Sequence, residues 1–233
     1  MGQQRTFPSV EEATPEGLVA IGGQLCPDLV LEAYTEGIFP WPYAENSPMS
    51  WFSPNPRGIL QYKDLHYPRS LIKEFRRNQK HYTITFNEAF SRVIDECSVQ
   101  KRKNQPGTWI TSDIKKVYTE LNKLGFAYSL EVWNKEKNLV GGLYGMTIGQ
   151  MVSGESMFHR ESSASKIALL ALMEYLATVD VHWIDTQMST DVVKMMGGTL
   201  MSRRDFIFML KRDVWKTKKE DFMKTSFSFP LFS

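Results

Sequence analysis

The sequence predicts an α+β protein: a small, loop-rich N-terminal domain (residues 1–62), then a domain with a largely antiparallel sheet and packed helices (residues 63–233). Turn-forming residues crowd the first 60 positions, and three strand-like runs flanked by helical periodicity lie between residues 126 and 158. The 233 residues, 42% hydrophobic and 23% charged, are enough to bury a core. This composition argues against a disordered, collagen-like or coiled-coil protein.

The N-terminal segment contains one clear helix. Residues 28–36 fit a helix that Asp28 caps and Gly37 ends. Turn signals surround it, including Thr14-Pro15-Glu16-Gly17 and five prolines between residues 40 and 56. Because aromatic residues are too frequent here for a linker, we expect a small folded domain.

A basic amphipathic helix is expected from Pro68 onward. Leu71, Ile72 and Phe75 fall on one arc of a helical wheel. The opposite arc carries basic residues, namely Arg69, Lys73, Arg76, Arg77 and Lys80. This local charge, on a chain with a formal net charge of only +2, indicates either a polyanionic partner or a solvated surface.

The next elements alternate between strand and helix patterns. Residues 82–86 alternate like a strand, Asn87 is placed to cap the following helix, and a further helix near residues 114–124 ends at Gly125. Three strand-like runs separated by short loops then predict an antiparallel meander. They cover residues 126–133, 139–147 and 151–158.

The remaining elements complete a β-β-β-α-β-α order, which is the arrangement of acetyltransferase-like domains. They are an apolar helix, a strand, a short helix and a final helix, at residues 163–177, 181–187, 191–196 and 203–214. A coenzyme A pyrophosphate would require a glycine-rich loop before the helix at Ser163. Residues 159–165 contain no glycine, which argues against that cofactor.

Composition limits the class of protein further. No stretch approaches the ~18 uninterrupted apolar residues of a membrane span, and the first ten residues do not resemble a signal peptide, so we expect a cytoplasmic protein. Cys26 and Cys97 form no C-x-x-C pattern, which argues against a disulfide framework or a zinc site. We expect both thiols to be reduced and at least partly buried.

Three polar residues interrupt apolar strands. Glu155 lies in the run 151–158, while Asp185 and Gln187 lie in the run 181–187, where a two-residue period puts them on one face. An ionisable group inside a sheet needs a partner, so these residues indicate either a catalytic site or a structural hydrogen-bond network. The G-x-S-x-G, Walker, H-E-x-x-H and G-x-G-x-x-G motifs are all missing.

Seven sequence blocks occur in a fixed order along the chain. They are Gly37-Ile-Phe-Pro-Trp41, Trp51-Phe-Ser-Pro-Asn-Pro-Arg57, Thr108-Trp-Ile110, Leu139-Val-Gly-Gly-Leu-Tyr-Gly145, Gly154-Glu-Ser-Met-Phe158, Ser165-Lys-Ile-Ala-Leu169 and Ile184-Asp-Thr-Gln187. Together they resemble the leucyl/phenylalanyl-tRNA protein transferases over about residues 6–210. The resemblance implies transfer of Leu or Phe from aminoacyl-tRNA to proteins with N-terminal Arg or Lys, which marks them for degradation by the N-end rule.

This reaction needs no covalent nucleophile, metal or cofactor, because the aminoacyl ester is already activated. The attacking α-amino group has an ordinary pKa of about 7.7–8.0, and holding it against the ester can supply on the order of 7–11 kcal/mol. By the resemblance, Gln187 contacts the amine and Asp185 polarises Gln187.

The resemblance also implies binding sites for the donor and for tRNA. The donor side chain would contact Leu143, Val152, Glu155, Leu169, Leu172, Leu176 and Ile184, with Trp51, Trp109 and Tyr118 around the terminal adenosine. From the pattern alone, the aliphatic residues fit a plain core equally well. Strand parity puts Ile184 opposite Asp185 and Val152 opposite Glu155, so this set requires a bulge or a pocket at the strand edge. Some relatives carry Phe where Val152, Leu172 and Leu176 stand here.

Three functions are consistent with these observations. The first is a monomeric aminoacyltransferase whose partners are aminoacyl-tRNA (Leu, Phe or Met) and acceptor proteins, with the basic helix on the tRNA phosphates. The second is a coenzyme A-dependent acyltransferase on the same fold. The third is a non-catalytic tRNA-binding module.

Overall fold

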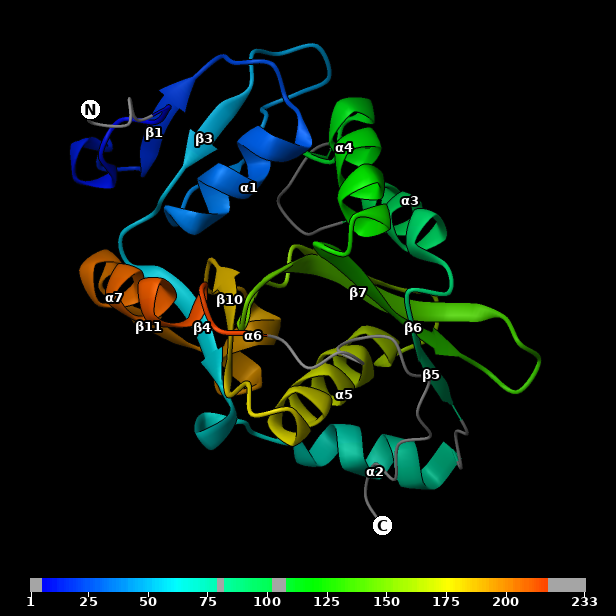
Figure 1. Ribbon diagram of the computed structural model, residues 1–233. Helices are drawn as coiled ribbons and strands as arrows, with labels where there is room; N and C mark the ends of the chain where they lie inside the picture. The colour runs from blue at the N-terminus through cyan, green and yellow to red at the C-terminus, as the bar shows by residue number, and fades with distance from the viewer. Residues whose placement is uncertain (1–5, 79–81, 102–107, 218–233) are drawn as a thin grey trace.

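The computed structural model describes residues 6–78, 82–101 and 108–217 (Figure 1). Its α-helices are α1 (Pro27–Thr35), α2 (Arg69–Asn78), α3 (Phe90–Val99), α4 (Ser112–Lys123), α5 (Ala164–Thr178), α6 (Asp191–Met195) and α7 (Arg203–Asp213). Its strands are β1 (Leu18–Ile21), β2 (Phe39–Pro40), β3 (Ser50–Phe52), β4 (Arg57–Gln61), β5 (Thr83–Phe86), β6 (Ala127–Trp133), β7 (Leu139–Ile148), β8 (Met151–Val152), β9 (Ser156–His159), β10 (Trp183–Gln187) and β11 (Thr199–Met201). The predicted α+β class is confirmed.

The largest sheet is antiparallel and has the order β5-β6-β7-β8, with β9 also paired to β7. This confirms the predicted meander. The third predicted strand is wrong in one respect, because it is broken into β8 and β9. Between them Ser153 approaches β7 so closely that a Cβ on Gly145 would lie 1.8 Å from the Ser153 carbonyl oxygen. Regular pairing is interrupted over residues 153–155. The Ser153 and Glu155 amides still donate to carbonyl oxygens of β7, but the Met146 amide donates to Ser153 Oγ, and the Glu155 side chain contacts Gln187 of β10.

Two smaller sheets complete the fold. In the first, β4 pairs antiparallel with both β10 and β11; in the second, β3 pairs with β1 and β2. Strand β4 ends at Gln61, next to the expected boundary between residues 62 and 63, and pairs with strands from the C-terminal part of the chain. That domain division stays a prediction.

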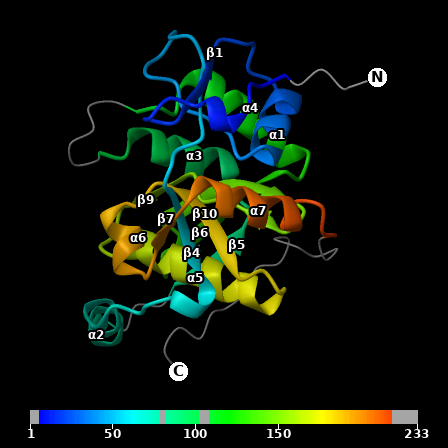
Figure 2. The ribbon, with the colours of Figure 1, turned by 90° about the vertical axis from the view of Figure 1, so that its left-hand side faces the viewer.

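Helices cover both faces of the large sheet. Helix α5 packs against β6 and β7 from one side, and α3 and α4 pack from the other (Figure 1). Figure 2 shows α1 and α4 above the sheet and α5 below it. Two buried apolar clusters follow from this layering, one beneath the N-terminal elements and one between the sheet and α5.

Three local predictions are wrong. Helix α1 begins at Pro27 with Cys26 as its N-cap, so Asp28 lies in the first turn, where a carboxylate suits the helix dipole. Ala89 caps α3, and Asn87 instead adopts a positive φ of 58° and accepts a hydrogen bond from the Ser129 amide. Cys97 is buried as expected, but Cys26 is exposed.

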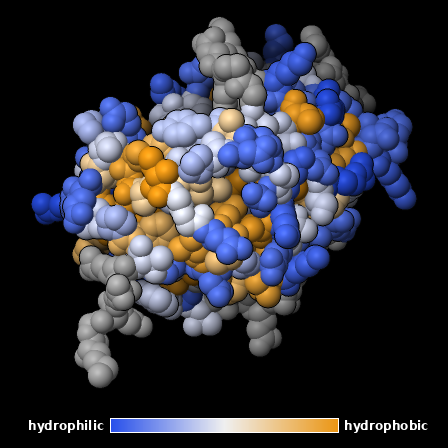
Figure 3. Space-filling model, turned by 90° about the horizontal axis from the view of Figure 1, so that it is seen from above, coloured by the Kyte–Doolittle hydropathy of each residue, from blue (hydrophilic) through white to orange (hydrophobic). Residues whose placement is uncertain are grey.

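The surface mixes polar and apolar residues. Figure 3 shows apolar side chains gathered in patches among hydrophilic ones on the upper face. Across the described surface, the large hydrophobic residues with more than half of their area exposed include Ile21, Tyr43, Phe208 and Trp215. Among the described residues, no helix combines the length and apolar character needed to cross a bilayer.

Candidate active site

The centre of the site is an irregular turn at the end of β10. The pairing of β10 with β4 shifts register between Asp185 and Gln187, and Gln187 has a φ of 55°. The Met188 amide donates to the Thr186 carbonyl oxygen, which closes a three-residue turn around Gln187. A non-glycine residue in this conformation costs about 1–3 kcal/mol, so neighbouring contacts must hold it.

Gly58 allows β4 to lie against this turn. A Cβ at Gly58 would come within 2.6 Å of the Met188 carbonyl carbon and 2.9 Å of Thr186 Oγ1. These distances are shorter than real Cβ atoms tolerate, so only glycine permits the close approach of the two backbones. The glycine therefore places the start of β4 directly beside Gln187.

Asp185 is held by a buried arginine. Arg57 donates from Nε to Asp185 Oδ1 (2.8 Å) and from Nη2 to Asp185 Oδ2 (2.6 Å). Each of the two residues is 1% exposed. The same Oδ1 accepts the backbone N–H of Gln187 at 2.9 Å. Asp185 thus contacts Gln187 through the main chain.

The side chain of Gln187 contacts a different carboxylate. Its Nε2 donates to Glu155 Oε1 at 2.8 Å, and Ser153 Oγ donates to the same oxygen at 2.6 Å. The pKa of Glu155 is raised from 4.5 to about 7. Burial is the main cause and the negative charge of Asp185 adds to it, while hydrogen bonds from Ser153, Tyr34 and Gln187 lower the pKa. Glu155 therefore changes its charge near neutral pH.

Two tyrosines extend this network toward the N-terminal elements. Tyr34 of α1 hydrogen-bonds Glu155, and its hydroxyl lies 2.7 Å from the hydroxyl of Tyr118 on α4. Burial raises the pKa of both tyrosines well above 10, so both stay protonated and can donate. Because ionised Glu155 only accepts, Tyr34 donates a hydrogen bond to it and accepts one from the Tyr118 hydroxyl. A continuous path joins Gln187, Glu155, Tyr34 and Tyr118.

The residues expected around the donor fall into two adjoining groups. The aliphatic ones belong to the buried cluster between the sheet and α5, and each is at most 2% exposed: Leu143, Val152, Leu169, Leu172, Leu176 and Ile184. Strand alternation puts Ile184 in this cluster and turns Asp185 away toward Arg57. The break between β8 and β9 separates Val152 from Glu155, so strand parity does not restrict that pair.

The aromatic residues expected around the adenosine lie in the other cluster, beneath the N-terminal elements. Trp51 Nε1 donates to the Gly22 carbonyl oxygen at 2.9 Å. Trp109 stacks on Trp41, with ring centroids 5.5 Å apart. Tyr118 connects this cluster to Glu155 through Tyr34. The two groups thus belong to different buried clusters, and their roles stay predictions.

The amphipathic helix is present as α2. Leu71 is buried, whereas Arg69 and Lys73 are exposed. Arg76 and Arg77 belong to this helix, and Lys80 lies outside the described residues. Contact with tRNA stays a prediction.

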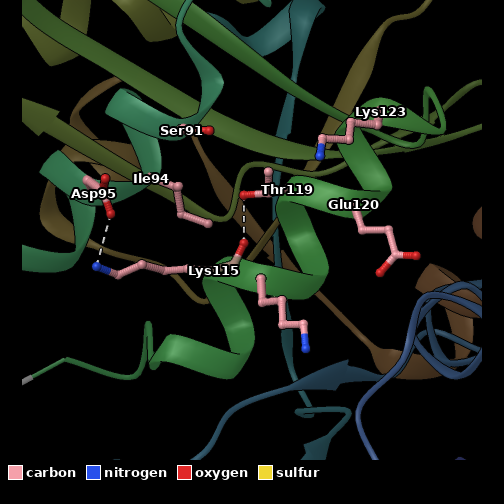
Figure 4. A pocket seen from close by; sticks show the side chains of 8 residues that line it. Ser91, Ile94, Asp95, Lys115, Thr119, Glu120 and Lys123 are labelled. Atoms are coloured by element: carbon pink, nitrogen blue, oxygen red, sulfur yellow. Dashed lines mark hydrogen bonds and ion pairs between the residues drawn. The ribbon is translucent and has the colours of Figure 1, made fainter.

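A surface groove lies apart from this network, between α3 and α4 (Figure 4). Within it Lys115 pairs with Asp95 at 3.0 Å, and the Thr119 hydroxyl donates to the Lys115 carbonyl oxygen. The groove is lined by Ser91, Ile94, Asp95, Lys115, Lys116, Thr119, Glu120 and Lys123. Three lysines and two carboxylates line it.

Sequence reasoning missed Arg57, Tyr34 and Ser153. Arg57 stands at the end of one of the seven ordered blocks, but its pattern does not mark it as a site residue. Tyr34 has the pattern of an ordinary buried helix residue, and Ser153 that of an ordinary strand residue. No local signal connects Arg57 or Tyr34 to Glu155 or Asp185, whereas the two-residue strand period puts Ser153 on the same face as Glu155.

Comparison with known proteins identifies the family. A family model for leucyl/phenylalanyl-tRNA protein transferase matches residues 59–211, and one for the N-terminal domain of that transferase matches residues 23–55. The leucyl/phenylalanyl-tRNA protein transferase of Maridesulfovibrio salexigens is 46% identical over 204 residues, which cover 88% of this chain and 84% of the relative. That of Lawsonia intracellularis is 46% identical, covering 88% of each chain, and that of Shewanella sediminis is 47% identical, covering 88% and 86%.

Proposed function

Because this chain belongs to the leucyl/phenylalanyl-tRNA protein transferase family, we propose that it moves Leu or Phe from aminoacyl-tRNA to proteins with N-terminal Arg or Lys. The product is a new peptide bond at the acceptor N-terminus, which marks the protein for N-end rule degradation. The enzyme acts as a cytoplasmic monomer without a cofactor, and Met-tRNA is a further donor.

The observation that carries the mechanism is the contact between Gln187 and Glu155. Because Gln187 Nε2 donates to Glu155, the amide oxygen on the other side of the group can accept an N–H of the acceptor amine. The amine nitrogen attacks the ester carbonyl, the C–N bond forms, and the bond to the 3′ oxygen of the adenosine breaks. One proton passes from nitrogen to that oxygen.

Glu155 supports this proton transfer. Its pKa of about 7 lies close to the working pH, where a group both accepts and releases a proton readily. Ionised Glu155 also holds the Gln187 amide in one orientation. Asp185 holds the backbone of Gln187 by accepting a hydrogen bond from its N–H.

Binding of the donor uses both buried groups. The aliphatic cluster takes the Leu or Phe side chain, and the aromatic cluster takes the terminal adenosine. Exposed Arg69 and Lys73 of α2 contact tRNA phosphates, which supplies affinity independent of sequence.

A transfer assay tests this function. The protein is mixed with labelled Leu-tRNA or Phe-tRNA and with peptides that begin with Arg, Lys or Ala. Label should enter the Arg and Lys peptides. It should not enter the Ala peptide or an Arg peptide with an acetylated N-terminus. Equal binding of charged and uncharged tRNA without any transfer would contradict the proposal and favour a tRNA-binding module. Binding of acetyl-CoA would favour an acyltransferase.

A further inference from the structure

We propose that Arg57 is a positioning residue of the transfer reaction: through Asp185 it holds the Gln187 backbone in the turn that presents its side chain to the reacting amine. The inference rests on the proposed function and extends the catalytic unit beyond Asp185 and Gln187 to a residue that touches no substrate.

The turn needs an external support. Gln187 is not glycine, yet its φ is 55°, and the register shift leaves it outside the regular ladder of β10 and β4. Such a conformation persists only where the surroundings determine it. Its own N–H is fixed by Asp185 Oδ1, so the position of that carboxylate determines the position of the turn.

Arg57 in turn determines the position of the carboxylate. Two donors of one planar guanidinium, Nε and Nη2, meet the two oxygens of Asp185, which fixes both the location and the plane of the carboxylate. An ammonium group would provide a point charge and would not fix the plane. Asp185 Oδ1 can then accept from Arg57 and Gln187 together.

The guanidinium is itself held on its remaining sides. Its Nη1 donates to the Gly37 carbonyl oxygen at 3.0 Å. Its central carbon lies 4.8 Å from the centre of the Phe39 ring and 4.3 Å from that of the Phe206 ring. These contacts come from residues 37–39, which follow α1, and from α7, so two distant parts of the chain define one orientation.

The burial of Arg57 predicts a specific kinetic effect. Nε, Nη1 and Nη2 of Arg57 all donate to protein groups, and the guanidinium lies against two aromatic rings, so we place Arg57 outside the surface that meets tRNA and acceptor. A change at Arg57 should therefore reduce kcat, because kcat depends on the orientation of the Gln187 side chain. The KM values for Leu-tRNA and peptide should stay within about twofold of wild type.

The test compares Arg57→Lys with a matched control, Arg203→Lys. Arg203 is also a buried arginine, 8% exposed, and its Nη1 donates to the Ser53 carbonyl oxygen. Activity per folded molecule is measured well below the melting temperature of each variant. Arg57→Lys should lower kcat at least about tenfold, whereas Arg203→Lys should keep kcat within about twofold.

A double-mutant cycle separates positioning from general damage to the fold. Asp185→Asn and Arg57→Met are combined, which removes both charges and leaves no unpaired buried ion. If Arg57 acts through Asp185, the double variant has the same kcat as Asp185→Asn alone. This comparison of kcat values tests the positioning role even if Arg57→Lys does not fold. A further loss in the double variant, or wild-type kcat in folded Arg57→Lys, would overturn the proposal.

Hydrogen exchange separates this inference from the proposed function. In wild type the Gln187 N–H is protected by Asp185, so its exchange should accelerate at least about tenfold in Arg57→Lys and stay unchanged in Arg203→Lys. A wild-type protein without transfer activity would refute the function and leave this measurement valid. Unchanged exchange in Arg57→Lys would refute the positioning role even where transfer is observed.

Discussion

Glu155→Gln separates the charge of Glu155 from its shape. Glutamine keeps an oxygen that can accept from Gln187 Nε2 and from Ser153 Oγ, so these two hydrogen bonds persist while the ionisation disappears. If ionised Glu155 receives the proton of the acceptor amine, the ratio of wild-type to variant kcat must rise as Glu155 becomes ionised. That occurs around its pKa of about 7.

The structure sets the size of this effect. With a pKa of about 7, Glu155 is about one-tenth ionised at pH 6 and about nine-tenths ionised at pH 8. The ratio of wild-type to variant kcat should therefore rise about tenfold between these pH values. The acceptor amine also titrates in this range, but its contribution is common to both enzymes and cancels in the ratio.

Stability should change in the opposite direction. Folded Glu155 keeps its proton up to about pH 7, whereas the unfolded chain releases it near 4.5, so the free energy of unfolding falls as the pH rises through this window. The shift corresponds to about 3 kcal/mol at pH 8. Because glutamine has no such penalty, Glu155→Gln should melt higher than wild type at pH 8, and the difference should vanish below pH 4.5.

The assay measures kcat at saturating Leu-tRNA and Arg peptide from pH 6 to pH 8, with melting curves at each pH. Glu131→Gln is the matched control, because Glu131 is a fully buried carboxylate of β6 that accepts from Thr85 and Ser129. Its kcat ratio to wild type should not vary with pH. A flat ratio for folded Glu155→Gln would refute the assignment of Glu155 to proton transfer.

Three further predictions concern the other parts of the site. Gln187→Ala should lower kcat at least about tenfold with unchanged affinity for tRNA in a filter-binding assay; a parallel loss of binding would make the residue structural. Neutralising Arg69 and Lys73 should weaken tRNA binding and reduce its salt slope by about one unit for each phosphate that the variant no longer neutralises, whereas an unchanged slope would place tRNA elsewhere. Leu172→Phe should shift the kcat/KM ratio from Phe-tRNA toward Leu-tRNA, provided that overpacking, which costs about 1–3 kcal/mol, leaves the melting temperature near wild type; an unchanged ratio would assign Leu172 to the core.

The helices could be predicted because their apolar residues recur at helical spacing. In α4, Ile114, Val117, Tyr118 and Leu121 are all buried, as the periodicity requires. The strands of the meander were equally clear. Strands β1 to β4 were not, because they are two to five residues long and lie in a segment where prolines and turns hide any alternation. Contacts with strands elsewhere in the chain determine how these strands pair, as where β4 pairs with β10 and β11.

The candidate site could be predicted only in part, because its key contacts join distant residues. Arg57 and Asp185 are 128 positions apart, and no local pattern relates a basic residue at a strand start to a carboxylate in another strand. Glu155 and Gln187 are 32 positions apart. Each was noticed as a polar residue in an apolar run, but the pattern could not show which carboxylate would meet which end of the glutamine.

Strand parity was a valid guide up to Asp185 and failed at the next residues. It correctly separates Ile184, which enters the aliphatic cluster, from Asp185, which turns to Arg57. It also suggests that Asp185 and Gln187 act side by side, but the register shift intervenes, and the Gln187 side chain reaches Glu155 instead. Regular strands bury the aliphatic cluster because alternation places every second side chain on the packed face. Under the proposed function Gln187 has to meet a reacting amine, and both Gln187 and Glu155 lie where regular strand pairing is interrupted.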